Sequence, residues 1–169
     1  GALYQTNEQI DDAFIKVKIA LDITENLFDN NEAIWGKEYL MVLRNLASLY
    51  LYDDIKEVKS AINVYKKSLV KIEALFEKDN DTWIKDYITN LKGLAHSYIE
   101  DDEDDDAIEQ LKIAFKIINK RFYNYPKVWS TDYIIILENL ISLYLENYYI
   151  EEALPLVDEV INIKKILLK

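Results

Sequence analysis

The sequence contains no cysteine and has only three glycines, two prolines and one histidine among its 169 residues. Without cysteine there is no disulfide, no thiolate metal site and no cysteine nucleophile, and the compartment stays open, with the cytoplasm as the default location. Tight turns of sheets and phosphate-binding loops depend on glycine and proline, so their scarcity argues against both. The composition therefore favours helices.

Positive charge and long apolar runs are also scarce. Twenty Lys and Arg residues against 31 Asp and Glu residues give a net charge of -11, which repels nucleic-acid phosphates and anionic lipid headgroups. No apolar run approaches the roughly 20 residues that a membrane-spanning helix needs. We therefore expect no nucleic-acid partner and no membrane insertion.

Candidate catalytic or metal-binding groups are few. The only histidine, His96, has no cysteine and no recognisable serine-nucleophile motif to pair with. Two interpretations of His96 stay open: a groove residue that contacts a ligand or senses pH, and a polar side chain that faces solvent. The acidic run at 100–106 lacks the Gly and Glu of an EF-hand loop, so a solvated turn with a helix cap is favoured over a calcium site. We predict no catalytic residue, no metal, no cofactor and no enzymatic activity.

Internal repetition is the strongest positive signal in the sequence. Three segments align without gaps, and each carries Trp, then Tyr at +4, Leu at +8 and +11, and Tyr at +15. These steps trace one side of an α-helix, which we call the packing stripe. Its register favours burial of the tryptophans over an aromatic ladder for a ligand. The fifteen stripe residues are Trp35, Tyr39, Leu43, Leu46, Tyr50, Trp83, Tyr87, Leu91, Leu94, Tyr98, Trp129, Tyr133, Leu137, Leu140 and Tyr144.

A second helix is expected after each stripe segment. Each is marked by a small residue, Ala61, Ala107 or Ala153, that would let two helices approach closely. The same spacing to the following Trp places a corresponding small residue at Ala13, so the first helix of the chain is an unpaired second helix. We predict one domain, 1–169, with repeats at about 33–77, 81–122 and 127–168. The seven antiparallel helices are expected at 8–29, 33–52, 55–77, 81–100, 104–122, 127–146 and 150–168.

The third repeat resembles a known family most closely. NLISLY at 139–144 followed by EEALPL at 151–156 is similar to tetratricopeptide (TPR) repeats of the kinesin-light-chain-like variety, and NLASLY at 45–50 resembles the same pattern. The resemblance implies an all-α, right-handed superhelix, or α-solenoid, whose first helices line a concave groove for a peptide or protein segment. The repeat of 46 to 48 residues is longer than the usual length of about 34, which implies longer helices.

Carrying over the concave face of this family gives eight candidate groove residues on the first helices. Asn45 and Asn139 stand where related proteins hold peptide backbone, whereas Gly93 in the second repeat would open space or break an Asn ladder. Arg44 and Lys92 would attract an acidic or polar peptide. The eight candidates are Arg44, Asn45, Ser48, Lys92, His96, Glu138, Asn139 and Ser142.

The sequence therefore predicts a protein-interaction module or scaffold that binds a peptide or protein segment in the groove. Two alternatives stay open. One is a self-association module that forms a homo-oligomer through terminal helices without a polar cap. The other is the ligand-sensing part of a larger bacterial regulator.

Overall fold

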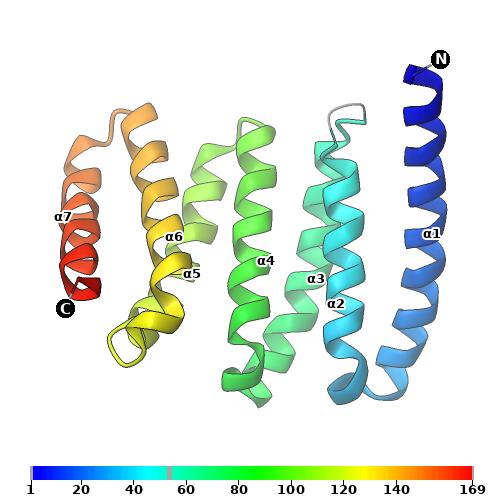
Figure 1. Ribbon diagram of the computed structural model, residues 1–169, viewed down its shortest axis with the longest axis horizontal. Coiled ribbons are helices and arrows are strands. Elements are labelled where there is room, and N and C mark those ends of the chain that lie inside the picture. The colour runs from blue at the N-terminus through cyan, green and yellow to red at the C-terminus, as the bar shows by residue number, and fades with distance from the viewer. Residues whose placement is uncertain (1, 53–54, 169) are drawn as a thin grey trace.

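The computed structural model describes residues 2–52 and 55–168, with side chains from residue 9 onward. This part of the chain forms seven α-helices and no strand (Figure 1), as predicted. The first helix begins earlier than expected and the third begins later, because residues 55–57 belong to a turn. The helices are α1 (Ala2–Asn30), α2 (Glu32–Tyr50), α3 (Val58–Lys78), α4 (Asn80–Glu100), α5 (Asp104–Phe122), α6 (Pro126–Glu146) and α7 (Ile150–Leu167).

Each helix packs mainly on the helix before it and the helix after it, and α2 also touches α4. In Figure 1 the first helices of the pairs, α2, α4 and α6, lie in front of α3 and α5, while α1 and α7 stand at the two ends. Such a stack is held together by contacts between neighbours, as in other repeat proteins.

The packing stripe forms the centre of these contacts. Thirteen of its fifteen residues are buried, and the other two, Trp35 and Tyr50, are half-buried. Ala61, Ala107 and Ala153 are at most 1% exposed. The prediction that the stripe is core and that these alanines are buried between helices is therefore confirmed.

One glycine is needed where two pairs meet. A Cβ atom on Gly36 would lie 2.6 Å from the Trp83 ring, closer than packed atoms approach. Gly36 thus makes room on α2 for the tryptophan that opens the stripe of α4.

Side chains cap the starts of α2 and α4, but the acidic run at 100–106 provides no such cap. The side chain of Asn31 accepts from the Ile34 amide at the start of α2, and that of Asp79 accepts from Thr82 at the start of α4. Asp79 is therefore the cap of α4. The cluster at 104–106 lies in the first turn of α5, where it faces the positive end of the helix dipole without a side-chain cap bond.

The turn inside each helix pair repeats one conformation. Lys56, Asp102 and Tyr148 have φ values of 47°, 57° and 62°, in the left-handed region where glycine is usual. The amide of the following residue donates to the carbonyl of the last stripe tyrosine at 2.9, 2.9 and 2.7 Å. The chain therefore makes these three turns with residues other than glycine.

Stripe tyrosines also join the helix pairs through their hydroxyl groups. Tyr39 donates to Glu25 (3.0 Å) and Tyr87 donates to Glu73 (3.0 Å), in each case fourteen residues back along the chain. Tyr133 donates to Asn119 at the same spacing. Burial, reinforced by nearby carboxylates, raises the pKa of all three phenols.

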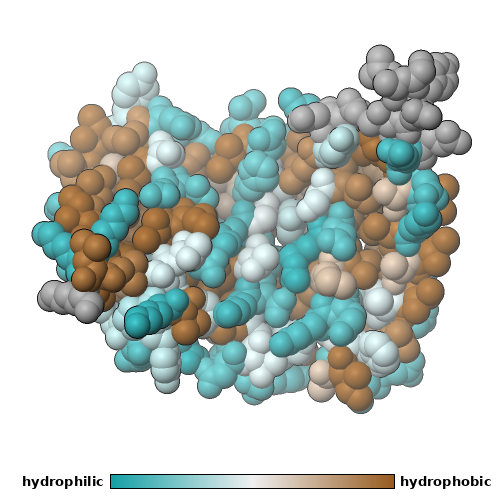
Figure 2. Space-filling model, in the orientation of Figure 1, coloured by the Kyte–Doolittle hydropathy of each residue, from teal (hydrophilic) through white to brown (hydrophobic). Residues whose placement is uncertain are grey.

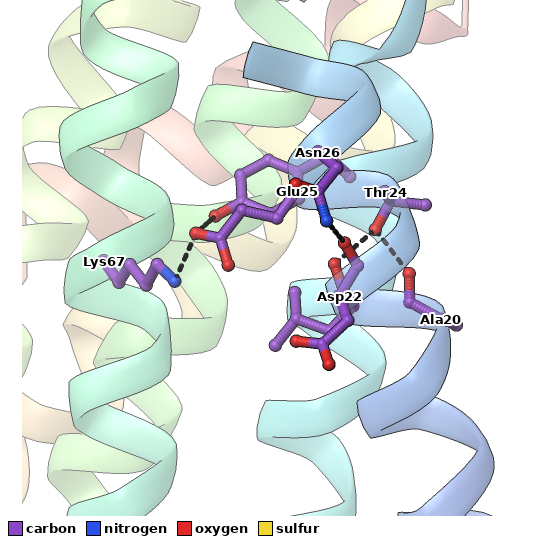
Figure 3. A network of polar contacts seen from close by, with 8 residues as sticks. Ala20, Asp22, Thr24, Glu25, Asn26 and Lys67 are labelled. Carbon is purple, nitrogen blue, oxygen red and sulfur yellow. Dashed lines mark hydrogen bonds and ion pairs between the residues drawn. The ribbon is translucent and has the colours of Figure 1, made fainter. Parts of the chain in front are cut away.

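Glu25 connects three helices. It accepts from Tyr39 of α2 and from Lys67 of α3, the latter at 2.7 Å (Figure 3). The hydrogen bond with Lys67 is the main cause that lowers the pKa of Glu25. The end helix α1 is thus held by a charged contact as well as by apolar packing.

We predict that Ala107→Leu lowers the free energy of unfolding by about 1 to 3 kcal/mol, because the added atoms overpack a fully buried position. Urea denaturation measures the change. Glu109→Leu on the exposed side of α5 is the matched control and should have little effect. An unchanged midpoint for Ala107→Leu would count against the repeat register.

The stripe tyrosines predict a loss of stability at high pH. Their pKa values are higher in the folded chain than in the unfolded one, so their contribution is complete below about pH 10 and is lost as the pH rises beyond it. Each phenol should remove up to about 1.4 kcal/mol of unfolding free energy per pH unit. Urea denaturation between pH 9 and 11 tests this. Tyr87→Phe should make the decline shallower, and an equally steep decline in that variant would contradict the assignment.

Candidate protein-binding face

The eight candidate groove residues all lie on α2, α4 and α6, and none is buried. Arg44 and Lys92 are half-buried, and the other six are exposed. We call the exposed side of these three helices the first-helix face. In Figure 2 its middle is mainly hydrophilic, while hydrophobic patches lie toward both ends of the stack.

Two ion pairs cross the first-helix face from one helix to the next. Arg44 Nη1 of α2 lies 3.1 Å from Asp86 Oδ1 of α4, and Lys92 Nζ of α4 lies 2.5 Å from Asp132 Oδ1 of α6. In both pairs the cation stands nine residues after the stripe Trp, and the carboxylate stands three residues after the next stripe Trp. We call this arrangement the ion-pair ladder. Its side chains are 18% to 33% exposed, so it is partly shielded from solvent.

The ladder changes the expectation for the two cations. Sequence reasoning treated Arg44 and Lys92 as cations available to a ligand, but each already has a carboxylate partner. Asp86 and Asp132 were missed, although aligning the repeats places both at the same position. In the third repeat the cation position holds Glu138, which is exposed.

The sequence suggested that Gly93 would open space in this face, but the ring of a neighbouring side chain fills that space. A Cβ atom there would lie 2.5 Å from the ring of Tyr65, which reaches from α3 and is 6% exposed. Burial raises the pKa of Tyr65, and a hydrogen bond with Ser48 and the charge of Arg44 oppose this shift. Tyr65 therefore neighbours two of the candidate residues, Ser48 and Arg44. The sequence had not indicated Tyr65 as part of this site.

The first-helix face also contains apolar side chains. Met41 is 49% exposed and Ile135 is 38% exposed, and both stand six residues after a stripe Trp, where α4 has Thr89. Aligning the repeats could have identified both residues, because they stand at the same position of the repeat. The face therefore offers apolar contacts beside its amides and ion pairs.

His96 and the acidic run at 100–106 were the candidates for a catalytic or metal-binding role. His96 is exposed on α4, and Asp104 in the acidic run accepts a hydrogen bond from Asn147 at 2.8 Å. Within residues 2–52 and 55–168 there is no group of three or more His, Asp or Glu side chains placed to hold a metal ion. In the same residues, none of the helices has the length and apolar character needed to cross a bilayer.

An apolar pocket of about 400 Å³ lies between the start of α6 and the end of α7. At the same place the other pairs have polar contacts: Lys78 pairs with Glu32, and Arg121 lies 2.5 Å from Asp81. Sequence reasoning did not predict this difference. The pocket is lined by Tyr125, Pro126, Lys127, Val128, Ile166 and Leu167.

The helix arrangement is similar to that of the crystal structure of BtubC (BKLC) from P. vanneervenii, with a TM-score of 0.71 at 18% sequence identity. The similarity covers 94% of this chain and 58% of that chain, so this chain spans little more than half the length of BtubC. Two crystal structures of Podosopora anserina putative kinesin light chain nearly identical TPR-like repeats are 16% identical. They match with TM-scores of 0.37 and 0.35 over 99% and 96% of this chain and 96% and 95% of theirs.

No protein-family model matches the sequence, and no curated protein matches it. The fold is nevertheless defined by the structure: the described residues form seven helices that pack in chain order, a stripe recurs in each first helix among them, and BtubC has a similar arrangement. The chain therefore has the fold of a TPR-like helical repeat protein.

Proposed function

We propose that this chain is a protein-interaction module that binds an extended segment of a partner protein along the first-helix face. The observation that carries the proposal is that eight polar residues on three successive first helices lie outside the buried core, six of them exposed and two half-buried. Residues that the core does not use are available to a ligand, and repeat proteins bind along such continuous surfaces. We propose a binding role and not an enzymatic one.

The chemistry of the face suggests what kind of segment fits. Asn45 and Asn139 carry amides that both donate and accept, which suits the backbone of an extended peptide. Arg44 and Lys92 can bind an acidic side chain if it replaces Asp86 or Asp132 as their partner. We therefore propose a ligand with acidic and polar residues, with Met41 and Ile135 providing apolar contacts.

Two matched variants test this proposal. Arg44→Gln with Lys92→Gln removes the cations, and Asp86→Asn with Asp132→Asn leaves the cations without their partners. Both variants break the ion-pair ladder, so structural damage should affect both in the same direction. We predict that an acidic peptide selected on the parent chain binds the first variant about tenfold more weakly and the second more tightly. Fluorescence anisotropy measures both affinities.

The salt dependence provides an independent measurement on the same complex. Attraction between exposed charges should weaken as the ionic strength rises and the Debye length falls below about 8 Å. If both variants bind the peptide as the parent does, the first-helix face is not the binding surface. If both lose binding equally, the ladder has a structural role only, and the proposed charge recognition is wrong.

Self-association is the second candidate, and the surface of α1 favours it. Ile15, Ile19 and Ile23 recur every four residues along α1 and are 59%, 56% and 55% exposed. Such an apolar stripe on an end helix could pair with the same stripe of a second copy. Sedimentation velocity at several protein concentrations distinguishes a stable monomer from a dimer formed in this way.

A further inference from the structure

The space beside Gly93 on α4 is filled from α3, and the residues at these two positions differ between the repeats. A Cβ atom on Gly93 would lie 2.5 Å from the Tyr65 ring and 2.7 Å from the Tyr65 hydroxyl oxygen. The equivalent pairs of the other two repeats are Val17 with Asn45 and Leu111 with Asn139. The middle repeat therefore has a phenol and a glycine where the others have an aliphatic side chain and an amide.

This exchange brings a hydroxyl group from a second helix to the first-helix face. Asn45 and Asn139, at the repeat position of Gly93, are both exposed, so the tip of the Tyr65 ring lies where an exposed side chain would begin. Tyr65 as a whole is 6% exposed, and its neighbours therefore hold the ring in place. A hydroxyl fixed by packing loses little conformational freedom when a ligand binds to it.

Two residues of α2 act on this hydroxyl from the same side of their helix, four residues apart. The hydrogen bond with Ser48 lowers the pKa of Tyr65 against the effect of burial, as expected when Ser48 donates to the phenol oxygen. The phenol O–H is then left to donate to a ligand. The charge of Arg44 acts in the same direction on the pKa. Arg44 pairs with Asp86 through Nη1, and because a guanidinium has five N–H donors, this ion pair leaves capacity for a second acceptor.

The second ion pair of the ladder lacks such a hydroxyl. Lys92 is followed one turn later by His96, and the second-helix residue at the repeat position of Tyr65 is Leu111, whose side chain has no polar atom. An ammonium also acts as a point charge, whereas a guanidinium can hold a carboxylate through two parallel hydrogen bonds. The two cations of the face are therefore not equivalent.

We propose that Arg44 and Tyr65 together bind an acidic side chain of the partner segment, with Ser48 orienting the Tyr65 hydroxyl. This subsite rests on the proposed function and places the acidic residue of the ligand between α2 and α4. A cation and a hydroxyl donor match the oxygen acceptors of a carboxylate, and hydrogen bonds to charged groups are stronger than those between neutral groups. Tyr65 is then the residue that makes the first ion pair of the ladder the preferred one for an acidic residue.

A double-mutant cycle between chain and peptide tests this subsite. The probe is the acidic peptide selected on the parent chain, amidated at its C-terminus so that only side-chain carboxylates can bind. Tyr65→Phe keeps the ring, removes the hydroxyl and should weaken binding about tenfold. One acidic residue of the peptide should account for this loss: once it is replaced by its amide counterpart, the parent chain and Tyr65→Phe should bind equally well. Fluorescence anisotropy with both chains and both peptides measures the four affinities.

Two further variants separate recognition from packing. Tyr87→Phe makes the same change at a buried phenol of the packing stripe and should leave the affinity unchanged. Tyr65→Leu with Gly93→Asn recreates the aliphatic and amide pair of the other repeats, so the chain should fold, which urea denaturation checks. It should lose the coupling to the acidic residue as Tyr65→Phe does, and retained coupling would contradict the role of the phenol.

The outcomes distinguish the subsite from the proposed function. The subsite is wrong if Tyr65→Phe binds the peptide as the parent does, if it weakens every amide-substituted peptide equally, or if Tyr87→Phe weakens binding as much. A loss of binding in Arg44→Gln with Lys92→Gln would still support the first-helix face in those cases. If no peptide binds the parent chain saturably, the proposed function fails and the subsite fails with it.

Discussion

Burial of the packing stripe between successive helices is the interaction on which the rest of this structure depends. Large aromatic and leucine side chains on each first helix meet helices whose small residues, such as Ala107, allow a close approach. The hydrophobic gain from each stripe is local, because helices pack almost entirely on their neighbours in the chain. The fold is therefore a row of similar interfaces.

The same constraint separates structural residues from residues available for binding. Since each stripe occupies one side of a first helix, the opposite side stays accessible, and there Asn45, Asn139 and the ion-pair ladder lie. The last stripe is covered by α7, whose own outer side remains apolar. The binding of a segment that we propose along the first-helix face thus relies on the same packing pattern that forms the core.

The helices and their core could be predicted from the sequence because the signal is local: steps of four, four, three and four residues define one side of a helix. The ladder could not be found in the same way, since it depends on how Arg44 on one helix lies relative to Asp86 on another. The contact of Tyr65 with Gly93 could not be predicted for the same reason, because the side chain that fills the space at this glycine comes from a different helix. The left-handed conformation of Tyr148 could not be predicted from the sequence, because tyrosine does not favour that conformation.

Hydrogen–deuterium exchange of the whole chain tests the central claim most directly. If stability comes from neighbouring interfaces, amides of the central helices α3, α4 and α5, covered on both sides, should exchange most slowly, and those of α1 and α7 should exchange first. Equal protection of all seven helices, with exchange only by global unfolding, would contradict this account.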